Sequence, residues 1–197
     1  MLGLSVIAGI LTTRVRIATT GQLAAACGVA PATLARRLGA MERTGWVHCG
    51  VGSLRCPVML QPVFTWRPGD PEPSFQRLAW RLDRRWAATE PAAVRLWWAT
   101  PQAVAEFGGV GGRVRQPLQL EHDCAVSEVF VRRGRDRDWR MEDLLTGESY
   151  GGKVPDAVVV EPGGADTVVE IGGQYPASRI EAFHRAMRSN DLTYELW

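Results

Sequence analysis

Apolar residues recur with a helical period in the first fifty residues. Leu34, Leu38 and Met41 are spaced i, i+4 and i+7, which places them on one face of a helix predicted over 31–44. Gly45 follows at the position where glycine commonly ends a helix. The exposed side of this helix would carry polar and basic residues, namely Thr33, Arg36, Arg37 and Arg43.

A second helix is predicted just before this one. Thr20 is a good N-cap for a helix over 21–27, and Gly28 supplies the turn that follows it. The apolar run 2–11 is also compatible with a helix. Two helices joined by a tight glycine turn, the second with a basic exposed face, predict a helix-turn-helix.

The next segment is expected to form a hairpin. Extended stretches at 46–48 and 54–59 flank a glycine-containing tip at 49–53, the pattern of two strands and a turn. Beside a helix-turn-helix this hairpin would be the wing of a winged helix. Arg55, in the returning strand, would then contact phosphate.

A proline-rich stretch suggests where this domain ends. Residues 67–73 contain three prolines and a glycine, which cannot continue a helix or a central strand. The expected organisation is therefore a winged helix-turn-helix at 1–66, a linker at 67–73 and a second domain at 74–197. The glycine-rich stretch 107–112 is expected to be a loop within the second domain.

The second domain alternates helical and extended patterns. The helix over 74–88 is expected to bury both Trp80 and Trp86. From residue 119 onward the predicted order is helix, strand, strand, strand, helix, strand. The ranges are 121–132, 139–145, 153–160, 167–171, 178–189 and 192–197. The predicted fold class is therefore mixed α/β (α+β), with an αβββαβ second domain.

Two carboxylates on paired strands carry the candidate chemistry. Asp156 follows a proline on one predicted strand, and Glu170 lies near the end of the next. On a hairpin their carboxylates could converge on one divalent cation, and hard oxygen ligands suit Mg²⁺ or Mn²⁺. Such an ion would activate water and offset the charge of a scissile phosphate. A third acid would come from the preceding helix, either Glu128 or Glu121.

This arrangement resembles the PD-(D/E)xK nucleases, which have a restriction-endonuclease-like fold. The resemblance implies a lysine two residues after the second acid, but this chain has Gly172 there. Lys153, the one lysine of the chain, stands three residues before Asp156 and would reach the site only through a bulge. Gln174 and Arg179 are alternative polar groups. Whether the chain is an enzyme stays open.

Three short motifs after the winged helix resemble the replication-relaxation family of plasmids and integrative elements. They are His122-Asp123, Lys153-Val-Pro-Asp156, and the run from Val169 to Tyr175. The resemblance spans nearly the whole chain. It implies a DNA-binding protein of a mobile element (plasmid, phage or integrative element) that acts in replication or its control.

Charge and composition agree with a nucleic-acid partner. Residues 1–70 carry a net charge of +5, and the remainder carries −3. A basic segment of this kind is typical of a protein that meets a polyanion. No apolar run is long enough for a bilayer, and the N-terminus lacks the features of a signal peptide. The four cysteines match no common zinc pattern. We therefore expect a cytoplasmic protein without a membrane partner.

Three functions follow from these patterns. The first is a double-stranded DNA-binding protein of a mobile element, with a nuclease-like second domain. The second is a metal-dependent endonuclease in which Asp156 and Glu170 bind the ion. The third is a winged-helix transcription regulator whose second domain senses a ligand or dimerises. Under this hypothesis the protein could be a homodimer.

Overall fold

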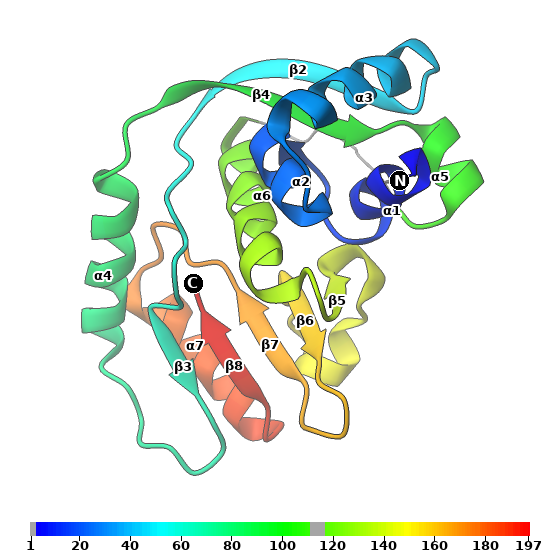
Figure 1. Ribbon diagram of the computed structural model, residues 1–197. Coiled ribbons are helices and arrows are strands. Elements are labelled where there is room, and N and C mark those ends of the chain that lie inside the picture. The colour runs from blue at the N-terminus through cyan, green and yellow to red at the C-terminus, as the bar shows by residue number, and fades with distance from the viewer. Residues whose placement is uncertain (1–2, 111–116) are drawn as a thin grey trace. The chain divides into compact units, whose positions relative to one another are not determined.

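The computed structural model describes residues 3–110 and 117–197, and these form two compact units (Figure 1). Unit 1 comprises Met1–Cys56 and Pro91–Arg135, and unit 2 comprises Pro57–Glu90 and Asp136–Trp197. Both units are thus built from two separate stretches of chain. The proline-rich stretch instead predicts consecutive domains on either side of 67–73. The last two residues of the glycine-rich loop expected at 107–112 lie outside the described residues.

Unit 1 combines helices with a small antiparallel sheet. Its elements, in chain order, are α1 (Leu4–Thr13), β1 (Ala18–Thr19), α2 (Thr20–Cys27), α3 (Pro31–Arg43), β2 (Val47–Leu54), β4 (Ala92–Ala99), α5 (Pro101–Phe107) and α6 (Pro117–Val129). A short π-helical segment, Phe130–Gly134, continues α6.

The two central helices form close to the expected positions. Thr19, one residue earlier than expected, caps α2, and its side chain forms a capping box with Gln22. Gly28 then adopts a left-handed conformation (φ 65°) that turns the chain toward α3. The apolar side chains of α3 spaced i, i+4 and i+7 are fully buried, as the periodicity predicts.

The expected hairpin tip at 49–53 is wrong, because these residues lie inside β2. This strand pairs with β4 along its whole length, from Val47 opposite Ala99 to Leu54 opposite Ala92. The sheet order is β1-β4-β2, with both pairs antiparallel. Gly50 does not mark a turn: a Cβ there would lie 3.0 Å from the ring of Trp98 on β4. The glycine makes room for that indole.

Unit 2 is built around a five-stranded mixed sheet. Its main elements are β3 (Phe64–Trp66), α4 (Phe75–Ala87), β5 (Asp138–Met141), β6 (Ala157–Val160), β7 (Thr167–Glu170), α7 (Ala177–Ser189) and β8 (Thr193–Leu196). The strand order is β3-β8-β7-β6-β5. The β7–β8 pair is parallel, with α7 as its connection, and the other pairs are antiparallel.

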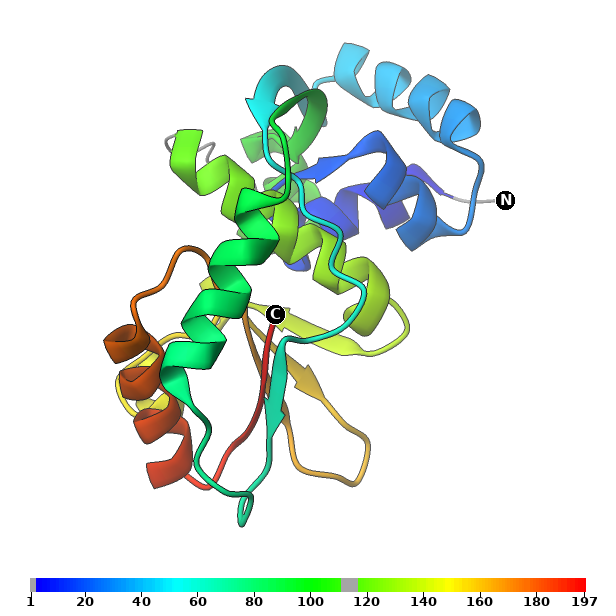
Figure 2. The same cartoon turned by 90° about the vertical axis from the view of Figure 1, so that its left-hand side faces the viewer.

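Helices α4 and α7 cover one face of this sheet (Figures 1 and 2). Leu82 of α4 and Phe183 of α7 belong to one buried cluster with Val158, Val168 and Tyr194 of the strands. Trp86 is buried as expected. The expectation that Trp80 is also buried is wrong, because 56% of its surface is exposed.

The coarse fold class is confirmed as mixed α/β. The described residues contain seven α-helices, an antiparallel three-stranded sheet and a mixed five-stranded sheet, with no closed barrel. The expected helix 121–132 exists as α6 and its π-helical extension, but it belongs to unit 1. Among the described helices, none has the length and apolar character needed to cross a bilayer.

A buried histidine should make the stability of unit 2 depend on pH. His184 of α7 is 2% exposed, and its Nδ1 lies 3.0 Å from the hydroxyl of Tyr194. Burial lowers the pKa of His184 from its ordinary 6.5; Glu72 opposes this shift and Arg188 adds to it. The unfolded chain therefore binds a proton first as the pH falls, and the free energy of unfolding decreases below about pH 6.5.

We expect His184→Gln to remove this component, which amounts to at most about 1.4 kcal/mol per pH unit. Urea unfolding between pH 5 and pH 7 measures it. An identical pH dependence in the wild type and His184→Gln would contradict the prediction.

Candidate functional site

Asp156 and Glu170, here called the acidic pair, lie at adjoining ends of neighbouring strands. Asp156 immediately precedes β6, and Glu170 is the last residue of β7. Val158 and Val168 face each other in this antiparallel pair, so extending the register by two residues places Asp156 opposite Glu170. Side chains two residues apart on a strand share a face. Both carboxylates therefore project from the face of the sheet that α4 and α7 cover.

Backbone hydrogen bonds hold the end of β7 in place. The backbone N–H of Ile171 donates to Oδ2 of Asp156 at 2.7 Å, which ties one carboxylate to the strand that carries the other. Trp197 at the end of the chain bonds the same segment on both sides. Its N–H donates to the Glu170 carbonyl (2.9 Å), and its carbonyl accepts from Gly172 N–H (2.8 Å).

Tyr175 and Arg179 lie beside Glu170. The Tyr175 hydroxyl donates to Oε1 of Glu170 at 3.3 Å, and Arg179 donates to that hydroxyl at 3.0 Å. The Arg179 guanidinium also lies over the Tyr175 ring, 3.7 Å from its centroid. Burial, then the charges of Glu170 and Asp156, raise the pKa of Tyr175 well above its usual range. The hydroxyl therefore stays protonated and remains a donor.

Sequence reasoning placed Arg179 near the site but assigned no role to Tyr175. The signal was present, because Tyr175 follows Glu170 by five residues and precedes Arg179 by four. An aromatic residue and an arginine spaced i, i+4 can stack where a helix begins. The structure shows that this pair brings a positive charge next to the carboxylates.

The acidic pair can offer a divalent cation two hard oxygen ligands. Each carboxylate has two oxygens with several lone pairs, so it can accept hydrogen bonds and also act as a ligand of a cation. Mg²⁺ is commonly held by one or two carboxylates, with water and substrate phosphate as its other ligands. Within the described residues, no group of three or more Asp, Glu, His or Cys side chains is placed to hold a metal ion. Water or phosphate would therefore have to supply the remaining ligands.

The candidate third acids belong to unit 1. Glu128 accepts from Arg132 (2.9 Å) and from the side chain of Gln22 (3.4 Å). Glu121 accepts from the backbone N–H of Arg55 at 2.8 Å. Within unit 2, the structure brings together the acidic pair, Tyr175 and Arg179.

The His122-Asp123 motif also lies on α6 in unit 1. Asp123 is buried and pairs with the buried guanidinium of Arg16 at 3.3 Å, which ties α6 to the segment before β1. His122 lies beside the same carboxylate, with Nδ1 at 3.6 Å from Oδ1. Asp123 therefore has a structural contact within unit 1.

The structure explains why position 172 carries no lysine. A Cβ on Gly172 would lie 2.5 and 2.6 Å from the two methyl carbons of Leu82, a fully buried residue of α4. The Gly172 carbonyl also accepts from Nε1 of Trp86 at 2.7 Å. Any side chain at this position would require the buried Leu82 side chain to move. Lys153 is exposed in the turn before β6, outside the strand.

The predicted DNA-contacting residues lie mostly on one helix of unit 1. Arg36 and Arg43 on α3 are exposed, whereas Thr33 and Arg37 are half-buried. Arg55 is exposed but follows the end of β2, so it does not lie in a returning strand. Sequence reasoning missed Arg95, which is exposed on β4 opposite Val51 of β2. Arg95 becomes a candidate for DNA contact only once β2 is known to pair with β4.

Comparisons of the chain with family models, with curated proteins and with solved structures found no match in any of the three.

The tight packing at Gly172 gives a stability prediction. Gly172→Ala should lower the free energy of unfolding by about 1–3 kcal/mol, because the added methyl overpacks a closed core. Gly173→Ala is the matched control: its Cβ would meet nothing closer than 3.5 Å, an ordinary contact with Tyr175. Chemical unfolding of both variants measures the difference.

A double-mutant cycle tests the cause. Leu82→Ala removes the methyl carbons that would clash, so Gly172→Ala should cost less in that background than in the wild type. Equal costs in the two backgrounds, or a Gly172→Ala variant as stable as Gly173→Ala, would refute the packing explanation.

Proposed function

We propose that this chain is a double-stranded DNA-binding protein that uses unit 1 as a winged helix-turn-helix. The observation that carries the proposal is the order of its elements. Strand β1 precedes α2, helices α2 and α3 are joined at Gly28, and β2 follows α3; β1, β4 and β2 then form one antiparallel sheet. In this interpretation α3 is the recognition helix and the β2–β4 pair is the wing.

The side chains of α3 suit this role. Residues near the N-terminus of a recognition helix face base edges in the major groove, which fits Thr33, Arg36 and Arg37. Arg43, at the other end of the helix, is placed for a phosphate contact. Arg95 on the wing, and Arg55 just after the end of β2, would add phosphate contacts outside the groove.

The proposed setting is the replication of a mobile element or its control. Support comes from the short motifs that resemble the replication-relaxation family. His122-Asp123 lies on α6, Asp156 lies just before β6, and the run from Val169 to Tyr175 extends across the end of β7.

A metal-dependent endonuclease is the second candidate function, and one observation favours it. Strands β5, β6, β7 and β8 lie side by side in the sheet in the same order as in the chain. The last two are parallel and linked by α7, as in a restriction-endonuclease-like core. The acidic pair lies where such a core holds its metal ligands. Asp156 and Glu170 would hold Mg²⁺ or Mn²⁺, and the ion would supply Lewis-acid chemistry at a phosphate. Arg179 provides a positive charge in a site that has no lysine at position 172.

Duplex binding should depend on α3. We expect Arg36→Ala combined with Arg43→Ala to weaken binding to a random-sequence duplex. The plot of log affinity against log salt should also lose about 0.9 of its slope for each phosphate contact removed. Fluorescence anisotropy at several salt concentrations measures both quantities.

Arg188→Ala is the control for this experiment, since Arg188 is an exposed arginine on α7 in unit 2. It should bind the duplex like the wild type. Unchanged affinity and salt slope in the α3 double variant would rule out α3 as the recognition helix.

Cleavage distinguishes the two candidate functions. If unit 2 is a nuclease, the wild type should nick or linearise supercoiled plasmid with Mg²⁺ or Mn²⁺, and Asp156→Asn should abolish this while retaining duplex binding. Asp166→Asn, an exposed acid in the β6–β7 turn, is the control. Salt-sensitive binding without cleavage by the wild type would leave a DNA-binding protein or a winged-helix regulator, and would exclude the endonuclease.

A further inference from the structure

Helix α4 of unit 2 presents a basic face with a tryptophan at its centre. Arg77, Trp80, Arg81 and Arg84 are spaced i, i+3, i+4 and i+7, so they lie on one side of the helix. All four are exposed, whereas the opposite side of α4 packs into the core of unit 2. We call these four residues the arginine–tryptophan stripe.

The stripe holds positive charge that the described part of the chain does not neutralise. The one acidic residue of α4 is Asp83, and among the described residues none of the three arginines pairs with a carboxylate. Arg77 and Arg81 stand at i, i+4, where like charges destabilise a helix. A polyanion lying along α4 would relieve this repulsion.

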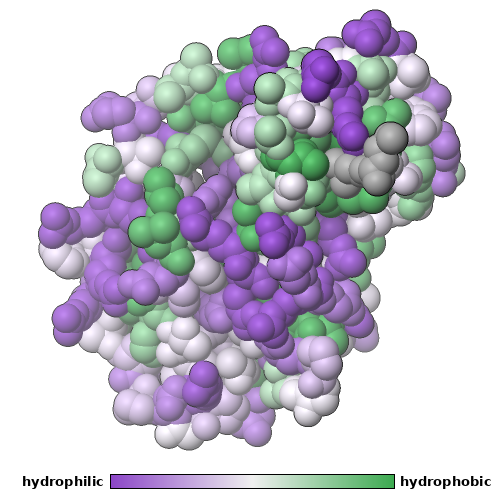
Figure 3. Space-filling view, in the orientation of Figure 1, coloured by the Kyte–Doolittle hydropathy of each residue, from purple (hydrophilic) through white to green (hydrophobic). Residues whose placement is uncertain are grey.

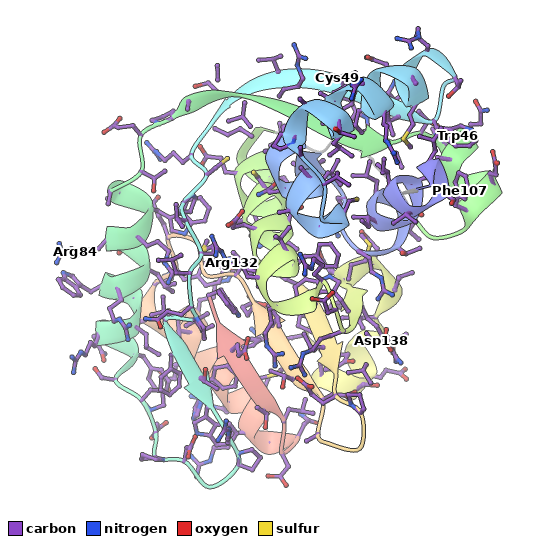
Figure 4. All side chains as sticks on the ribbon, in the orientation of Figure 1. Trp46, Cys49, Arg84, Phe107, Arg132 and Asp138 are labelled. Atoms are coloured by element: carbon purple, nitrogen blue, oxygen red, sulfur yellow. The ribbon has the colours of Figure 1, made fainter. Side chains whose placement is uncertain are left out.

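Trp80 adds a stacking surface to this charge. Its side chain is 56% exposed, and the Arg84 guanidinium lies 4.9 Å from the ring centroid. Arg84 points away from the body of unit 2 in Figure 4, and the margin of the unit at α4 is hydrophilic in Figure 3. Burial cannot explain a tryptophan at this position, since the core contacts of α4 are made by Leu78, Leu82 and Trp86.

We propose that the arginine–tryptophan stripe binds an unpaired strand of DNA. Proteins bind single strands by combining positive charge along the backbone with aromatic rings on which bases stack. A duplex already stacks its bases internally and offers no base face to an exposed indole. The stripe fits the single strand because it supplies an indole between arginines that can follow a phosphate backbone.

The stripe lies in the same unit as the acidic pair. Trp86 of α4 donates to the carbonyl of Gly172, two residues after Glu170, and Leu82 packs on the same glycine. The proposal does not rest on duplex recognition by α3, because the stripe belongs to a different unit and a different helix.

The experiment measures binding of the full chain to a fluorescent oligothymidine of about 20 nucleotides by anisotropy, at several salt concentrations. Trp80→Ala should weaken binding about tenfold, because one base loses its stacking partner. The salt slope should change little, because the substitution removes no charge from the protein. Arg81→Ala should reduce the slope by about 0.7, the value for one phosphate contact on a single strand. Trp80→Phe keeps a ring and should retain most of the affinity.

Arg188→Ala on α7 is again the matched control, and circular dichroism verifies that each variant is folded. Equal affinity of Trp80→Ala and the wild type for the oligothymidine would overturn the proposal. If Trp80→Ala lost as much affinity for a duplex as for the single strand, the proposal would also be overturned, since position 80 would then contribute to general phosphate binding. Duplex binding by the α3 variants is measured separately, so the failure of one proposal leaves the other intact.

Discussion

The contact between Leu82 of α4 and the backbone at Gly172 determines the geometry around the acidic pair. Because residue 172 has no side chain, α4 can approach the end of β7 closely enough for Trp86 to bond the Gly172 carbonyl. The adjoining N–H of Ile171 then bonds Asp156, and Trp197 bonds the backbone on either side. A lysine at position 172 is incompatible with this packing. Position 172, where the resemblance to the nucleases implies a lysine, is therefore part of the core of unit 2.

Local signals in the sequence predicted most helices and strands. The positions of α2, α3, α4 and α7 follow from spacing and capping, because both depend on residues within a few turns of one another. The pairing of strands does not have this local character. Gly50 and its neighbours have the composition of a turn, but a Cβ at position 50 would press against the indole of Trp98, nearly fifty positions later.

The proline-rich stretch 67–73 shows the same limit. Three prolines correctly predict that neither helix nor strand continues through it. The structure makes it a closed turn of unit 2, in which Asp70 accepts from the backbone N–H of Arg67 (2.9 Å) and from the indole of Trp66 (3.2 Å). The chain instead passes between units near Cys56, Glu90 and Arg135. Composition identifies where regular structure stops, whereas only long-range pairing shows that residues 55–91 interrupt the β2–β4 pair.

For the candidate site, the sequence identified the acidic pair but not what surrounds it. Asp156 and Glu170 could be placed because a short hairpin fixes the register of two consecutive strands. Tyr175 joins them through a loop whose path no local pattern specifies. Trp80 was misassigned because a helical period gives the spacing of the apolar residues but not how wide the buried face is.

Charge balance over long segments is a poor guide to which surfaces meet nucleic acid. Unit 2, residues 57–90 and 136–197, carries 11 basic and 16 acidic residues, a net charge of −5 that argues against DNA contact by the unit as a whole. At physiological salt, however, a phosphate responds mainly to charges within about 8–10 Å. Helix α4 carries four arginines and one aspartate in thirteen residues, although the segment around it is acidic. A strand along α4 would meet a local positive field, while the acids elsewhere in unit 2 would disfavour binding at other places. An acidic unit with one basic helix can therefore direct a polyanion to a single surface.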